Sequence, residues 1–262
     1  MNSPLELPAA LLVNYMLLLA RVAGLIGFAP IPGFRQIPAQ PKVVLALALT
    51  ALFAPFAVTA AGPEILNSPA SLWTLAGLLA AEAAFGIAIG AVLNLMLEAF
   101  GLAAQILGFQ AGYSYINMVD PNTQVDASVI NVLLTLLGGL LFFGFNLHLH
   151  LVRAVYLSFE RWPLGAFTVG PGGALAVVEF GGQVFETAVR LAFPVVAVLL
   201  LIDLTLGLLN QINSRLQLLT LAFPAKIVAS AALLYPVLLV APRLFNNLAE
   251  KAFELIALLV AR

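Results

Sequence analysis

The chain alternates between six long apolar blocks and short segments rich in polar residues, proline or glycine. The blocks extend over residues 9–28, 43–61, 72–107, 129–152, 175–209 and 218–244, and an amphipathic tail over residues 245–262 follows the last of them. A helix needs about 20 consecutive apolar residues to cross a bilayer. The pattern therefore predicts an all-α, polytopic membrane-type protein of about six long hydrophobic helices.

Proline interrupts several of the apolar blocks. The interior prolines are Pro55, Pro194, Pro224, Pro236 and Pro242. Each removes one backbone hydrogen bond and bends or stops its helix. Within a bilayer, broken helices are tolerated only where protein or a cavity covers the freed carbonyl groups. We therefore expect kinked helices, several of them buried in an assembly rather than exposed as simple spans.

The composition agrees with the membrane prediction. Of 262 residues, 63% are hydrophobic and 9% are charged, whereas an ordinary soluble domain has about 45–50% apolar and about 25% charged residues. The mean hydropathy is +1.08, so lipid or other protein chains must cover much of the surface. The net charge of -1 offers no electrostatic attraction for nucleic acid. The absence of cysteine excludes disulfides and thiolate chemistry.

The sequence predicts no catalytic or metal site. His148 and His150 are the only histidines; their i, i+2 spacing places them on different faces of a helix, whereas helical metal-binding pairs use i, i+4. No serine stands in a G-x-S-x-G motif, and no G-x-x-x-x-G-K-[ST] loop is present to bind a nucleotide. We therefore expect a protein that is not an enzyme and that uses no cofactor.

Several ionisable residues lie inside the apolar blocks, where each costs roughly 2.5–3.5 kcal/mol at a helix centre. They include Arg21, Glu82, Glu98, Arg190 and Asp203. Glu186 and Arg190 have the i, i+4 spacing that favours a local ion pair. Asp203 has no local partner, and Arg21 or Arg190 could serve it. Three interpretations stay open, namely ion pairs between helices or subunits, a proton or ion relay, and side chains that reach the membrane surface or water.

Small residues predict close helix packing in the third block. Gly86 and Gly90 form a G-x-x-x-G pattern. Such spacing lets the backbones of two helices approach each other closely. We therefore expect another helix to cross the third block at these glycines.

A polar and aromatic segment, residues 108–126, separates the third and fourth blocks. Its sequence, GFQAGYSYINMVDPNTQVD, combines bulky apolar side chains with glycine, asparagine and aspartate. A surface turn is one interpretation, although a turn of about 19 residues is uncommon. The other is a loop that folds inward as a constriction or plug, since large side chains occlude a channel while glycines permit movement.

Five motifs in register give the chain a family resemblance. They are RVAGLIGFAPIPGF near the start, AEAAFGIAIG at Ala81–Gly90, GFQAGYSYINMVDP, FNLHLHLVRAVYLSFERWPLG, and LLIDLTLGLLNQINSRLQLLTLAFPAKI near the end. Their order and spacing and the total length resemble the FliR/SctT family of type III secretion export-gate proteins. The FPAKI form of the last motif is more similar to the flagellar branch than to the injectisome branch.

The resemblance implies an assembly. Family members join FliP-like and FliQ-like subunits in a helical hetero-oligomer of bent hairpins around a central channel. Residues 1–170 would form a FliP-like helical part, and residues 171–262 a FliQ-like C-terminal hairpin. FlhB-like and FlhA-like export proteins are the further partners implied, and unfolded flagellar subunits are the export substrates. The implied location is the bacterial inner membrane within the flagellar basal body.

The resemblance also implies a plug at residues 108–122. The residues of this sequence that match it are Gly108, Phe109, Gln110, Gly112, Tyr113, Tyr115, Ile116, Asn117, Met118, Asp120 and Pro121. Phe109, Tyr113, Tyr115, Ile116 and Met118 would occlude the channel. Relatives often carry smaller residues where this chain has Tyr-Ser-Tyr-Ile-Asn, so the packing of the plug is expected to differ.

Charged residues complete the predicted sites. Contacts between helices or subunits are assigned to Arg21, Glu82, Arg190, Asp203 and Lys226. Of these, Asp203 and Lys226 match charged positions of the family's C-terminal hairpin. The alternative function is a small polytopic ion or metabolite transporter that uses Asp203, Arg190 and Glu82 near the membrane midplane.

Overall fold

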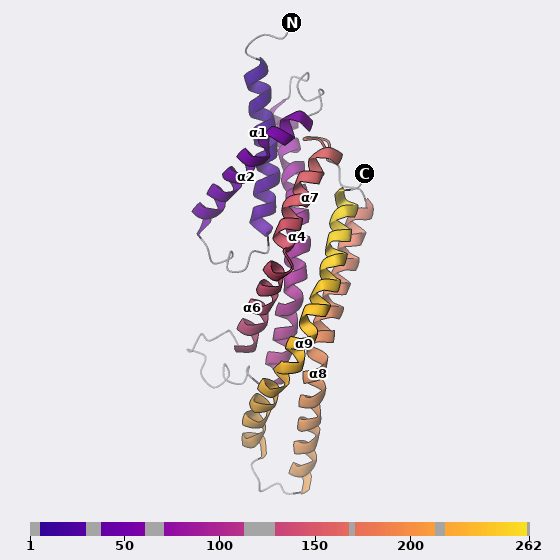
Figure 1. The fold of residues 1–262 in the computed structure, drawn as a ribbon. Helices are drawn as coiled ribbons and strands as arrows, with labels where there is room; N and C mark the ends of the chain where they lie inside the picture. Colours follow the sequence, from indigo (N-terminus) through magenta and orange to yellow (C-terminus); the bar gives the residue numbers. More distant parts are fainter. Residues whose placement is uncertain are drawn as a thin grey trace. The chain divides into compact units, whose positions relative to one another are not determined.

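The computed structural model describes residues 6–29, 38–60, 71–112, 129–167, 171–212 and 218–260. Within these ranges all regular structure is helical, and no strand occurs. The helices are α1 (Glu6–Phe28), α2 (Ala39–Ala60), α4 (Leu72–Gln110), α6 (Val129–Gly144), α7 (Leu147–Arg161), α8 (Pro171–Ile212) and α9 (Leu218–Val260) (Figure 1). The predicted all-α class is confirmed.

Five of these helices, α1, α2, α4, α8 and α9, are long and apolar enough to cross a membrane. The pair α6 and α7 supplies a sixth candidate span, broken at Phe145 and Asn146. Only 22% of the apolar stretch of α8 and 17% of that of α9 is buried within the chain. The chain is thus a multi-pass membrane protein whose apolar helix surfaces are left for lipid or other subunits to cover.

The break between α6 and α7 does not fall at a proline. Pro55 lies inside α2, Pro194 inside α8, and three prolines inside α9, and none of them stops its helix. The break between α6 and α7 falls instead at Asn146, whose φ of 56° and ψ of 29° are left-handed. Asparagine tolerates this conformation better than most side chains do. The prolines therefore stop none of the described helices, and kinks at them stay a prediction. The amphipathic tail is the continuation of α9.

Contacts within the chain divide it into two compact units. The first unit comprises Met1–Met96, Asn146–Phe180 and Glu250–Arg262, and the second comprises Leu97–Phe145 and Gly181–Ala249. The helices α4, α8 and α9 each contribute residues to both units. The division at residue 170 into FliP-like and FliQ-like parts concerns likeness to other subunits, and it stays a prediction.

The core of the first unit is built where α1 crosses α4. A Cβ atom on Gly86 would overlap the carbonyl oxygen of Arg21, and one on Gly90 would lie 2.8 Å from the carbonyl oxygen of Leu25. Glycine is therefore required for the backbones to approach this closely. The predicted G-x-x-x-G contact is confirmed. Helix α2 packs on α1 and α7. Its Phe53 ring lies 5.8 Å from the ring of Phe159 on α7.

The core of the second unit is aromatic. Phe100 of α4 is fully buried, and its ring meets that of Phe245 of α9 edge-on at 5.5 Å. The ring of Phe145 stacks on the same Phe245 at 5.9 Å. Gly138 of α6 faces Phe100, where a Cβ would lie 3.3 Å from the ring. These contacts hold the C-terminal half of α4 against α6 and α9.

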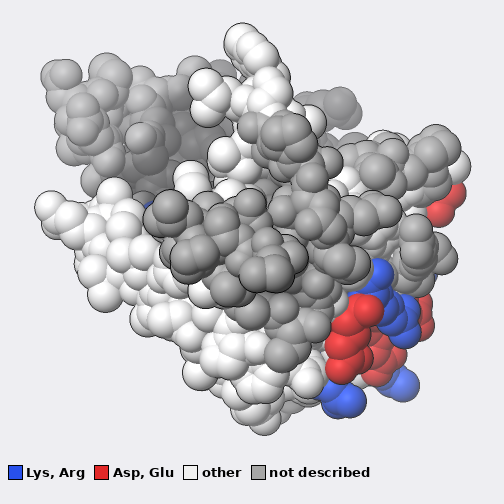
Figure 2. Space-filling model, turned by 90° about the horizontal axis from the view of Figure 1, so that it is seen from above, with Lys and Arg blue, Asp and Glu red and all other residues white. Residues whose placement is uncertain are grey.

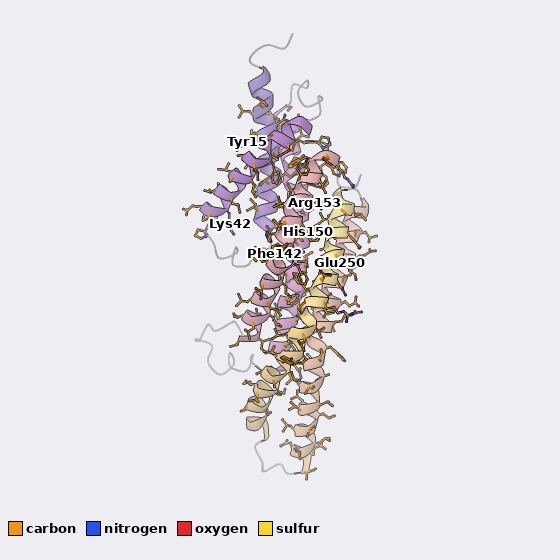
Figure 3. The ribbon with its side chains drawn as sticks, viewed as in Figure 1. Tyr15, Lys42, Phe142, His150, Arg153 and Glu250 are labelled. Carbon is orange, nitrogen blue, oxygen red and sulfur yellow. The ribbon has the colours of Figure 1, made fainter. Side chains whose placement is uncertain are left out.

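One view of the surface contains a compact group of charged side chains. Figure 2 shows acidic and basic atoms interleaved in one patch, with mostly uncharged surface over the other described residues in that view. In the first unit, exposed charged residues of α7 and of the C-terminal part of α9 are Arg153, Glu160, Arg161, Glu250, Lys251 and Glu254. Figure 3 labels three side chains of this region, His150 and Arg153 on α7 and Glu250 on α9. Here α7 and α9 are neighbours, since the rings of His150 and Phe253 lie 5.5 Å apart.

Candidate functional site

A buried ion pair joins α1 to α4 inside the first unit. The Arg21 Nε atom lies 2.5 Å from Glu82 Oε2, and Arg21 Nη2 donates to Glu82 Oε1 at 3.1 Å. The two side chains are 2% and 0% exposed. Such a two-pronged arrangement matches the planar guanidinium to the carboxylate and is the strongest geometry available to the pair.

Three further groups complete what we call the Arg21 cluster: the Ser158 side chain and the backbones of Trp162 and Gly165. Arg21 Nη1 donates to Ser158 Oγ at 3.1 Å, and Arg21 Nη2 donates to the Trp162 carbonyl oxygen at 3.1 Å. The Gly165 N–H donates to Glu82 Oε1 at 2.7 Å. Gly165 has a φ of 81°, a left-handed conformation that favours glycine. The cluster therefore ties α1 and α4 to α7 and to the turn after it.

Aromatic rings close the cluster from water. The Arg21 Cζ atom lies 4.8 Å from the ring centre of Phe85 and 5.1 Å from that of Phe159. Phe167, in the segment after α7, contacts the rings of both Phe85 and Trp162. A charge held among hydrogen bonds and ring faces is stabilised where an isolated one is not. The arrangement suits a fixed structural joint, because the carboxylate and the guanidinium already bind each other.

The C-terminal end of α4 holds the described part of the predicted plug. Gly108 is buried, Phe109 is 75% exposed, and Gln110 is the last residue of the helix. The Ala111 N–H donates to the Leu107 carbonyl oxygen at 2.8 Å, which continues the helical pattern for one residue. Gly112 then turns the chain with a φ of 86°, as glycine often does just after a helix. The other predicted plug residues, Tyr113, Tyr115, Ile116, Asn117, Met118, Asp120 and Pro121, lie outside the described residues.

Asp203 of α8 joins three helices of the second unit. Its Oδ1 atom lies 2.5 Å from Lys226 Nζ of α9, and its Oδ2 atom accepts a hydrogen bond from Gln110 Nε2 of α4 at 3.0 Å. The expectation that Arg21 or Arg190 would serve Asp203 is wrong. Arg190 instead pairs with Glu186 at 2.5 Å, and both side chains of that pair are more than half exposed.

The two histidines do not form a metal site with other described residues. His150 Nδ1 lies 3.1 Å from the Asn146 carbonyl oxygen at the start of α7. In the part of the chain that the structure describes, no group of three or more histidine, aspartate or glutamate side chains is placed to hold a metal ion.

The sequence did not predict all the partners of Arg21 and of Asp203. Ser158 and the backbone of Trp162 were not predicted as partners of Arg21, and Gln110 was not predicted as a partner of Asp203. The partners are separated from Arg21 by 137 and 141 residues and from Asp203 by 93 residues. No local pattern encodes contacts of that length. The only available signal was a polar residue inside an otherwise apolar stretch.

The long apolar helices and the buried ion pair between two of them define a polytopic α-helical membrane protein. The sequence profile described as bacterial export proteins, family 1, matches residues 12–252. The chain is 31% identical over 245 residues to the flagellar biosynthetic protein FliR of Escherichia coli (strain K12), covering 90% of this chain and 92% of that protein. It is 29% identical to FliR of Pectobacterium carotovorum subsp. carotovorum over 237 residues, with 90% and 88% covered, and 29% identical to FliR of Caulobacter vibrioides over 219 residues, with 83% and 85% covered. The chain belongs to the FliR family of bacterial export proteins.

Proposed function

We propose that this chain, a component of the flagellar export apparatus, forms part of the central channel of the export gate, and that residues 108–122 help to close it. The observation that carries the proposal is the family match along residues 12–252, with relatives named flagellar biosynthetic proteins. The matched region includes all of the described end of α4.

The exposed apolar surface supports a place within a larger assembly. The long helices α8 and α9 bury about a fifth of their apolar stretches within the chain. Helices of this kind need lipid or apolar helices of other subunits around them. The partners we propose are FliP-like and FliQ-like subunits in one hetero-oligomer, with FlhA-like and FlhB-like proteins beside it. The assembly would lie in the inner membrane at the flagellar basal body.

The end of α4 supports a role in closing the channel. Phe109 presents a largely exposed aromatic ring at the last turn of a 39-residue helix. Rings and aliphatic side chains close channels by excluding water from a constriction. In the closed gate the Phe109 ring would help to seal the passage that unfolded flagellar subunits take in the open gate. Energy for transport would come from other components of the apparatus.

The transporter alternative receives less support. Glu82 is bound to Arg21, Arg190 to Glu186 and Asp203 to Lys226. Each of the three residues that a transporter would use thus already has a partner of opposite charge. Membership of an export family favours the gate.

The channel proposal is tested by the ion permeability of the bacterial inner membrane. Deletion of residues 109–118 should raise the leak of small ions, while the deleted chain still co-purifies with its FliP-like and FliQ-like partners. Phe109→Ala should give a smaller leak in the same direction. The matched control is Phe193→Ala, which removes an exposed phenylalanine ring from α8 instead of α4. It should leave the membrane tight. A deletion variant that assembles and leaves the membrane tight would overturn the plug assignment.

A further inference from the structure

We propose that Asp203 is a positioning residue for the C-terminal end of α4, and that its carboxylate holds the last turn of this helix so that Phe109 faces the closed channel. The proposal rests on the proposed function and adds how the end of α4 is held. It concerns three described side chains, Gln110, Asp203 and Lys226, which we call the Asp203 junction. The junction joins helices α4, α8 and α9 within the second unit.

The two oxygens of the Asp203 carboxylate have different partners. Oδ1 lies 2.5 Å from Lys226 Nζ, and Oδ2 accepts the Gln110 amide hydrogen at 3.0 Å. A carboxylate held at one oxygen by an ammonium group has little freedom to rotate. Lys226 therefore aims the second oxygen at Gln110 and also balances the charge of Asp203.

The surroundings strengthen this contact. Asp203 lies within the apolar stretch Leu175–Ile212, and the Lys226 side chain is only 13% exposed. Hydrogen bonds to ionised groups are stronger than neutral ones, and a low local dielectric strengthens them further. Asp203 itself is 39% exposed, so the contact remains open to exchange with water. These properties suit a joint that holds a helix end without locking it permanently.

The contact adds a side-chain restraint at the end of α4, where Leu107 and Ala111 are already buried and Phe109 is exposed. The last four carbonyl groups of a helix lack partners within the helix, so terminal turns fray readily. Gln110 is the final residue of α4, and Phe109 directly precedes it. Binding of the Gln110 side chain to α8 therefore helps to fix the rotation of the last turn, and with it the direction in which the Phe109 side chain leaves the helix.

Exchange of donor and acceptor gives a sharp test. Gln110→Glu retains the shape of the side chain but places a second carboxylate against Asp203. The two carboxylates should repel each other, whereas the Gln110 amide donates a hydrogen bond to Asp203. We expect the ratio of open to closed gate to rise about tenfold, which corresponds to about 1.4 kcal/mol. Combining Gln110→Glu with Asp203→Asn restores one amide and one carboxylate in reversed positions, and leaves one negative charge for Lys226. The double variant should return the leak to within about twofold of the unmodified chain.

The experiment uses the full chain expressed with its natural partner subunits in cells. Three quantities are measured for each variant: small-ion leak across the inner membrane, the amount of assembled complex, and secretion of flagellar subunits. The matched control is Glu186→Gln, which breaks the exposed ion pair with Arg190 on the same helix and should leave the leak unchanged. The expected result is a leak with Gln110→Glu at normal assembly, and a tight membrane with the double variant.

The possible failures can be told apart. If deletion of residues 109–118 leaks but Gln110→Glu is tight at normal assembly, the positioning role is overturned and the plug remains. If the deletion itself is tight in an assembled complex, the plug assignment within the proposed function fails, and the positioning role fails with it. If Gln110→Glu does not accumulate, the double variant decides: normal assembly with a tight membrane supports the junction, and a leak or failed assembly overturns it.

Discussion

Glu82→Gln should destabilise the first unit by about 3–5 kcal/mol, the usual cost of removing one partner from a buried ion pair. Glutamine has nearly the same volume as glutamate and still offers an oxygen to the Gly165 N–H. It removes the negative charge that balances Arg21, whose side chain is 2% exposed. The free energy of unfolding therefore falls because a positive charge stays buried without its counterion.

The contacts of Arg21 set the size of this effect. Arg21 donates two hydrogen bonds to Glu82, and hydrogen bonds to charged groups contribute about 1.5–3 kcal/mol each. Glutamine loses the bond at Oε2 and weakens the bond at Oε1, because its oxygen is uncharged. The resulting estimate of about 2–4 kcal/mol overlaps the cost of breaking a buried pair. The contacts of Arg21 to Ser158, the Trp162 carbonyl and the rings of Phe85 and Phe159 persist in the variant, so they add nothing to the loss.

The assay follows unfolding of the full chain in detergent micelles by tryptophan fluorescence. The chain has only two tryptophans, Trp73 and Trp162. In a chain that carries Trp73→Phe, the fluorescence comes from Trp162 alone. It therefore reports unfolding near the Arg21 cluster, to which the Trp162 backbone belongs. Arg21→Met combined with Glu82→Leu removes both charges and should recover part of the stability that Glu82→Gln loses, because an apolar pair can replace a buried ion pair. The recovery is incomplete because the Gly165 N–H and the Trp162 carbonyl lose their partners.

Two results would refute this reasoning. A loss below about 1 kcal/mol for Glu82→Gln would mean that water reaches Arg21 and screens its charge, as at a surface pair. Equal losses for the single variant and for the double variant would mean that shape, rather than charge balance, determines the stability of the joint.

The remaining predictions are measured by the same unfolding assay, as changes in the free energy of unfolding. Gly86→Ala should cost about 1–3 kcal/mol because its Cβ overlaps the Arg21 carbonyl oxygen, whereas Gly77→Ala, with open space around it, should be neutral or stabilising by up to about 1 kcal/mol; equal effects would contradict the close crossing of α1 and α4. Asn146→Ala should cost about 1 kcal/mol at its left-handed φ, while Asn146→Gly should not destabilise. Ser158→Ala should cost about 1–3 kcal/mol by leaving an Arg21 N–H unsatisfied; a neutral result would indicate that water replaces the hydroxyl.

Hydropathy alone predicted the helices well because the membrane imposes a simple rule on the chain. Each spanning segment must be long and apolar, so the third block, residues 72–107, could be read directly and corresponds to α4, Leu72–Gln110. Proline was less informative. It removes a single hydrogen bond, and the neighbouring bonds and packing of a long helix continue past it, as at Pro194 of α8. The break at Asn146 depends on one left-handed residue that no apolar pattern marks.

The candidate site was harder to predict because its contacts join distant parts of the chain. The local pair of Glu186 and Arg190 follows from i, i+4 spacing and is present. Sequence patterns could identify Arg21 and Glu82 as costly charges, but could not show that the two bind each other across 61 residues. The partner of Asp203 was misjudged for the same reason. Lys226 lies on the next helix, and only folding of the hairpin brings it close.

The central claim, that this chain is a subunit of an export gate, is tested most directly by the mass of its native complex. The chain would be expressed with the FliP-like and FliQ-like proteins of its own cell, extracted in mild detergent and weighed by native mass spectrometry. The account predicts one defined hetero-oligomer that contains this chain together with both partners. A stable monomer or homo-oligomer that excludes both partners would contradict it.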